Sequence, residues 1–153
     1  MGYEVVVEDV TVRPLAAVRR LVPVGHVGGA WRPALDLVWD FLRRHEGLRT
    51  DGHNTFVYRH VVGRRDVLEV EFGVEVSRVF EREGEVMCTF TPAGRAATTV
   101  HTGPIPGLAD ASAAIEAWCI AHGSPLAGVS WEVYGDPDDD PARHEVRVFC
   151  LLA

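Results

Sequence analysis

The sequence predicts an α+β fold made of two βαββ-like halves related by pseudo-two-fold symmetry, with an antiparallel sheet and two main helices. Two segments with helical spacing of apolar residues are each flanked by runs rich in Val, Thr and aromatic residues, which are typical of strands. The same order of patterns occurs twice along the 153 residues. The composition, 47% hydrophobic and 24% charged, is that of a globular chain large enough to bury a core.

The first half is predicted to contain four strands and one helix. The strands lie at residues 3–10, 14–22, 54–62 and 66–76, and the helix at residues 31–47. The first two strands are runs rich in β-branched residues. In the helix, Pro33 suits the first turn and Gly47 the C-terminal cap, and a glycine-rich link precedes it.

The second half repeats this plan. Its strands are predicted at residues 85–90, 94–103, 130–135 and 144–152, with a helix from about Leu108 to His122. An offset of 76 residues places Gly52 on Gly128 and aligns the apolar faces of the two helices. In the segments before the helices the offset between the two halves is 80 residues, which aligns Ala16 with Ala96. Loops absorb such length differences.

The repeat predicts one domain, residues 1–153, with internal halves at approximately 1–80 and 84–153. A duplication of this kind places a central pocket at the junction, lined by equivalent positions of both halves. Glu132 then aligns with Phe56, and Tyr134 with Tyr58. Such a pocket would concentrate aromatic surface around a single carboxylate.

Glu132 is the unusual residue of its strand. Side chains alternate across a strand, so Glu132 shares a face with Ser130 and Tyr134, and Trp131 lies on the other face. Two interpretations remain open. Glu132 is either an exposed edge residue, as most glutamates are, or a buried carboxylate that recognises a cation.

Charge and composition narrow the partners. The formal net charge of −7 leaves no broad basic surface, so no direct nucleic-acid binding is expected. The acidic run at residues 136–143 is interpreted as a hairpin turn, because its spacing does not match a calcium site. The seven histidines lack metal-ligand spacing, so no metal and no cofactor are expected.

The cysteines and the N-terminus predict a cytoplasmic protein. Cys88, Cys119 and Cys150 are an odd number at wide spacing, which does not indicate a disulfide framework. The first residues lack the layout of a secretion signal. No apolar run approaches the roughly 18 residues that span a bilayer, so no membrane partner is expected.

At the motif level the chain resembles the GyrI-like, or bacterial effector-binding, domain family. The segment "VHTGPIPGL" at residues 100–108 is similar to the family's His-x-Gly-Pro turn before the helix. Trp118 and Gly123 match its Trp and Gly, and Glu132 with Tyr134 match its Glu-x-Tyr. The resemblance covers nearly the whole chain. It implies tandem SHS2-type modules whose central pocket takes flat, hydrophobic, often cationic compounds, with Glu132 at the base.

Six aromatic residues are candidate ligand contacts besides Glu132. They are Tyr134, Phe56, Tyr58, Trp39, Trp118 and, as a weaker candidate, Phe149. Tryptophans at helical spacing more often belong to a core than to a ligand cage. The resemblance favours Trp39 and Trp118 as contacts, because the family's helices flank the pocket.

The function expected from these features is that of a stand-alone sensor or sequestering protein for hydrophobic, cationic aromatic xenobiotics, as in multidrug binding. Two alternatives follow from the same resemblance. One is a hydrolase that opens the cyclopropyl ring of DNA-alkylating compounds, with Glu132 and Tyr134 as its catalytic residues. The other is a protein-interaction module with gyrase as partner.

Overall fold

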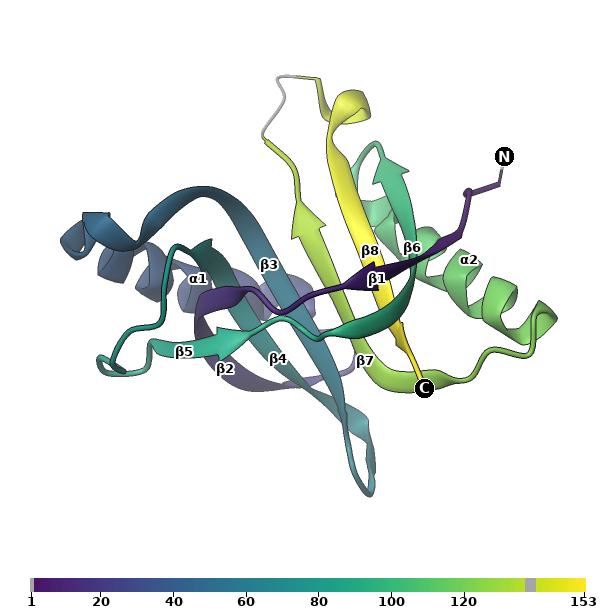
Figure 1. The fold of residues 1–153 in the computed structure, drawn as a ribbon, viewed down its shortest axis with the longest axis horizontal. Coiled ribbons are helices and arrows are strands. Elements are labelled where there is room, and N and C mark those ends of the chain that lie inside the picture. Colours follow the sequence, from purple (N-terminus) through teal and green to yellow (C-terminus); the bar gives the residue numbers. More distant parts are fainter. Residues whose placement is uncertain (1, 137–139) are drawn as a thin grey trace. The chain divides into compact units, whose positions relative to one another are not determined.

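The computed structural model describes residues 2–136 and 140–153, which form eight strands and two α-helices (Figure 1). The contacts divide the chain into two compact units. The middle unit is residues 12–91, and the terminal unit joins the described residues up to Thr11 with those from Pro92 onward. The predicted α+β class is confirmed.

The middle unit has four antiparallel strands in the order β3-β4-β2-β5 and one long helix. These elements are β2 (Pro14–Pro23), α1 (Val27–Arg44), the 3-10 turn η1 (Glu46–Leu48), β3 (Arg49–Val61), β4 (Arg64–Val76) and β5 (Met87–Phe90). The helix packs on β2 and β4. Its buried residues are Ala34, Leu35, Val38, Phe41 and Leu42, the helical spacing that the sequence predicted.

The terminal unit has the strand order β1-β6-β8-β7 and the second helix. Its elements are β1 (Val6–Val10), β6 (Gly94–Thr102), the 3-10 turn η2 (Ile105–Gly107), α2 (Leu108–Ala121), β7 (Leu126–Tyr134), the 3-10 turn η3 (Pro141–Arg143) and β8 (Glu145–Leu152). The helix packs on β6 and β8. The core between them consists of Ala97, Leu108, Ala111, Ile115, Cys119, Val146, Val148 and Cys150.

The two halves exchange their first strands, an arrangement that the sequence analysis did not predict. β1 pairs with β6, and β5 pairs with β2. The registers correspond, because Val10 lies opposite Gly94 and Phe90 lies opposite Pro14, positions related by the 80-residue offset. Arg13 precedes a proline, which favours extended backbone, and the link carries no hairpin residues. The chain therefore continues past β1 instead of folding back.

This exchange gives the compact units boundaries that differ from the predicted halves at 1–80 and 84–153. β1, the first strand of the first half, belongs to the terminal unit, and β5, the first strand of the second half, belongs to the middle unit. Each unit is thus a βαββ segment completed by one strand from the other half.

Helix α1 begins at Val27, before the predicted start at Trp31. The glycine-rich link predicted there is partly helical, since Gly28 and Gly29 lie in the first turn, and Pro33 lies inside the helix. Intrinsic propensity disfavours glycine in a helix, but tertiary context overrides it. The turn before α1 uses Gly25, whose φ of 88° is a left-handed conformation that glycine adopts without steric cost.

The predicted hairpin turn at residues 136–143 falls partly on residues 137–139, which lie outside the described residues. In the described part, the Asp140 side chain accepts a hydrogen bond from the backbone N–H of Ala142 and caps η3. Neither described helix is long and apolar enough to span a bilayer.

Candidate functional site

The strand face that carries Glu132 is the face that α2 covers. In the β7–β8 ladder Glu132 lies opposite Val148, and Tyr134 lies opposite Val146. Both valines are buried in the core against α2. Because paired residues share a face of the sheet, Glu132 projects toward the same apolar side. Its side chain is half-buried.

Tyr134 holds the Glu132 carboxylate. The Tyr134 hydroxyl donates a hydrogen bond to Oε1 of Glu132 over 2.8 Å. The Tyr134 ring is half-buried and packs against the core of the terminal unit. The two predicted site residues therefore form one fixed pair, because packing orients the ring and the hydroxyl orients the carboxylate.

The charge of Glu132 acts on the core beside it. The pKa of the Cys150 thiol is raised to about 12, mainly by burial and to a smaller extent by negative charge at Cys119, Glu116 and Glu132. Burial also raises the pKa of Cys119. All three cysteines are free thiols. A thiol with so high a pKa stays protonated, so Cys150 is a packing residue and not a nucleophile.

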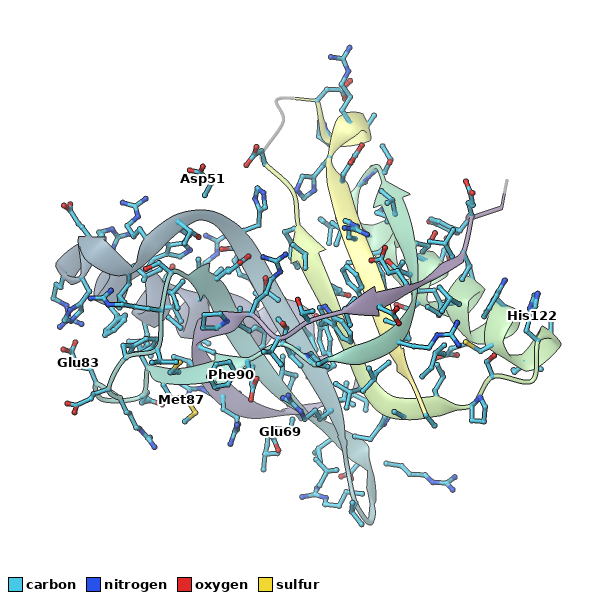
Figure 2. The ribbon with its side chains drawn as sticks, viewed as in Figure 1. Asp51, Glu69, Glu83, Met87, Phe90 and His122 are labelled. Carbon is cyan, nitrogen blue, oxygen red and sulfur yellow. The ribbon has the colours of Figure 1, made fainter. Side chains whose placement is uncertain are left out.

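The other predicted residues of the terminal unit have different surroundings. Trp118 is half-buried against the core, and its ring stacks on His122 with ring centres 4.0 Å apart. His122 marks the end of α2 in Figure 2. Phe149 lies opposite Trp131 in the ladder, and the two rings stack at 4.9 Å. Phe149 therefore lies on the sheet face opposite Glu132.

In the middle unit, Phe56 and Tyr58 share the face of β3 that is turned toward α1. Phe56 lies opposite Phe72, and the rings make an edge contact at 4.9 Å. The ring of Trp31 on α1 lies 6.4 Å from Phe56. Phe56 is 5% exposed, whereas Tyr58 is half-buried. Of these two predicted contacts, Tyr58 offers the larger accessible surface.

Trp39 has two neighbours that the sequence analysis did not identify. Its indole Nε1 donates a hydrogen bond to Oδ1 of Asn54 over 3.2 Å. The guanidinium of Arg49 lies over its ring, 5.6 Å from the ring centre. Period-2 alternation would place Arg49 and Asn54 on opposite faces of the strand, so no local signal predicted that both reach the same indole.

The described residues offer no metal centre, because no group of three or more His, Cys, Asp or Glu side chains among residues 2–136 and 140–153 is arranged to hold an ion. The predicted turn motif at His101 has a structural role. Since the Pro104 carbonyl accepts from Nε2 of His101, Nδ1 accepts from the Tyr3 hydroxyl over 2.8 Å. This buried histidine joins the N-terminal segment to the entry of α2.

Comparison with known proteins assigns the family. Residues 3–150 match the model of the GyrI-like small molecule binding domain, so the chain belongs to this family and the predicted resemblance is confirmed. No curated protein sequence matches the chain.

Solved structures show the same fold. The C-terminal domain of EcmrR has a TM-score of 0.83 at 21% identity, over 100% of this chain and 99% of that domain. SAV2435, solved with bound tetraphenylphosphonium, has a TM-score of 0.73 at 9% identity, over 100% of this chain and 94% of that protein. A hydrolase encoded by lin2189 from Listeria innocua has a TM-score of 0.67 at 11% identity, over 99% and 93% of the two chains.

Proposed function

We propose that this small-molecule-binding domain binds hydrophobic aromatic cations, with Glu132 as the partner of the ligand's positive charge. The observation that carries the proposal is the Glu132–Tyr134 pair on an apolar, helix-covered strand face. A carboxylate in such surroundings is poorly solvated and gains more from a cation than an exposed carboxylate does. The tetraphenylphosphonium bound to SAV2435 supports this ligand class.

The decisive experiment compares two ions of the same outline and opposite charge. Tetraphenylphosphonium is expected to bind the wild-type protein, and tetraphenylborate is not. Glu132→Gln keeps the shape of the side chain and removes its charge, so phosphonium affinity should fall about tenfold to a hundredfold, the range for losing a charged hydrogen-bonding partner. Titration calorimetry measures both ions.

The matched control is Glu116→Gln, which removes an exposed carboxylate from α2 in the same unit. It should leave the phosphonium affinity unchanged. Equal affinity for the two ions, or equal losses in the two variants, would show that Glu132 does not select cations.

Aromatic side chains are proposed to hold the ligand's rings by stacking and cation–π attraction. The accessible surface of Tyr58 supports a contact more than the burial of Phe56 or Phe149 does. Replacing Tyr58 by Leu should weaken phosphonium binding with little effect on the unfolding midpoint. The same replacement at Phe56 should lower the midpoint, because Phe56 packs against Phe72.

Hydrolysis of cyclopropanoid compounds is the second candidate, supported by the 2.8 Å contact between Glu132 and Tyr134 and by the likeness to the Listeria hydrolase. In this reaction Glu132 would accept a proton from water as the water oxygen attacks a ring carbon. The ring C–C bond breaks, its electron pair moves onto the conjugated carbonyl oxygen, and that oxygen takes up the proton that Glu132 received. To polarise this carbonyl, Tyr134 would turn its single O–H from Glu132 to the carbonyl oxygen. Ring-opened, hydroxylated product from wild-type protein but not from Glu132→Gln would establish the enzyme; unchanged substrate would leave binding alone.

A further inference from the structure

The start of β3 contains a bulge that changes the direction of one side chain. Arg49 pairs with Val76, and the next residue in the ladder with β4 is Asn54, which pairs with Val74. Asn54 is five residues after Arg49 in β3, whereas Val74 is two residues before Val76 in β4, so β3 has three extra residues here. Because an odd number of extra residues reverses the alternation of side chains between the two faces, Arg49 lies on the same face as Asn54, the face turned toward α1. Asp51, in the bulge, projects away from the ribbon of β3 (Figure 2).

Arg49 uses this direction to lie over Trp39. Its guanidinium is 5.6 Å from the ring centre of the indole. Within the described parts of the chain Arg49 makes no ion pair, and its side chain is exposed. The cation is therefore placed by an aromatic ring and the bulge rather than by a carboxylate, which leaves its hydrogen-bond donors available to a ligand.

Asn54 adds a second donor at the same indole. Because its Oδ1 accepts the hydrogen bond from Trp39, its amide nitrogen is directed away from Trp39. Tyr58 lies on the same face of β3, four residues on, and is half-buried. One strand face therefore presents a guanidinium, an amide N–H group and accessible aromatic surface.

We infer that Arg49, Trp39 and Asn54 form a binding site for an aromatic carboxylate. A carboxylate accepts from the planar guanidinium, which matches its geometry, while a flat ring packs on aromatic side chains. The Trp39 ring already interacts with a cation of the chain itself, so this site disfavours a second cation. The inference goes beyond the function proposed above, since it concerns an anionic group and residues of the middle unit alone.

The chain supplies its own comparison. Arg32 also lies over a tryptophan, 4.6 Å from the ring centre of Trp31. Arg32 belongs to α1, and no strand bulge directs it. In the terminal unit, the position that corresponds to Arg49 at the 76-residue offset is Pro125, so the repeat does not provide a second copy of the site.

The test uses the whole chain labelled with 5-fluorotryptophan, whose four fluorine NMR signals are assigned with single Trp→Phe variants. The probes are 2-naphthoate and its neutral analogue 2-naphthamide. Naphthoate should shift the Trp39 signal and bind about fivefold more tightly than naphthamide, as expected for an exposed ion pair. Arg49→Gln should remove this advantage, and Arg32→Gln should not.

Equal affinities of the two probes in the wild type would overturn the inference, as would an Arg32→Gln loss equal to that of Arg49→Gln or an unmoved Trp39 signal. If Arg49→Gln fails to fold, the affinities of both probes for the wild type are measured at increasing salt concentration instead. Salt should lower the affinity for naphthoate and leave that for naphthamide unchanged. Tetraphenylphosphonium binding, measured on the same Arg49→Gln and Arg32→Gln samples, reports the Glu132 function, because neither substitution changes Glu132 or Tyr58.

Discussion

At the residue scale, Tyr134 is one partner that holds the Glu132 carboxylate. Its hydroxyl is the donor of the 2.8 Å hydrogen bond, and its ring packs on the core. Tyr134→Phe keeps the ring and removes the donor. We expect phosphonium affinity to fall by about threefold to tenfold, less than for Glu132→Gln, because the charge remains and only its orientation is lost. Calorimetry of both variants gives the order, and a larger loss for Tyr134→Phe would contradict it.

Glu71 is a second carboxylate with an unusual environment. It is 1% exposed, and its Oε2 lies 2.8 Å from Arg19 and 3.1 Å from Arg59. Glu69, labelled in Figure 2, also pairs with Arg19 but is 31% exposed. Removing one member of a buried ion group leaves charges uncompensated.

We therefore expect Glu71→Gln to lower the free energy of unfolding by about 1–3 kcal/mol, since both arginines keep contact with water. Glu69→Gln, the control on the same strand face, should cost less than about 1 kcal/mol. Urea unfolding measures both. If Glu69→Gln lowers the free energy of unfolding as much as Glu71→Gln does, or more, burial of the carboxylate does not determine its contribution to stability.

At the element scale, α2 and β8 place Cys150 in the core, where the pKa of its thiol is raised to about 12. The unfolded chain loses this proton near pH 9, so between these values the folded state binds more protons and stability falls as pH rises. At pH 10.5 the loss is about 2 kcal/mol relative to pH 8. Cys150→Ala should remove the part of the alkaline loss that Cys150 contributes and leave the part that comes from the raised pKa of Cys119. Cys88→Ala, the half-buried control, should keep the whole loss; urea unfolding at both pH values measures it.

The elements also show what the sequence can and cannot predict. Both helices were predicted because the apolar spacing is a local signal, and Val38 and Ile115 are buried as that spacing requires. Glu132 and Tyr134 stay candidate residues; Glu132 was singled out because a carboxylate is unusual on a strand face, and Tyr134 from the repeat and the Glu-x-Tyr match. The role of Arg49 was missed, because the bulge that directs it depends on the partner strand β4.

At the scale of the whole molecule, the spacing of apolar residues along the chain does not predict the exchange of β1 and β5. Strand pairing is non-local, and nothing in the residues of β1 specifies β6 as its partner. The repeat relates the two exchanged ladders to each other, since the offset of 80 residues takes Val10 to Phe90 and Pro14 to Gly94, so the register of one ladder gives that of the other.

The exchange makes a prediction about fragments of equal length. Residues 1–80 match the first sequence half but lack β5, so β2 keeps an unpaired edge and β1 has no partner strand. Residues 12–91 contain all four strands of the middle unit together with α1. Because unpaired backbone groups and exposed apolar faces destabilise a fold, we expect fragment 12–91 to show the more dispersed amide NMR spectrum and the slower hydrogen exchange in β2 and β4. Equal spectra, or better protection in fragment 1–80, would mean that β5 does not stabilise β2 and that the sequence half is the folding unit.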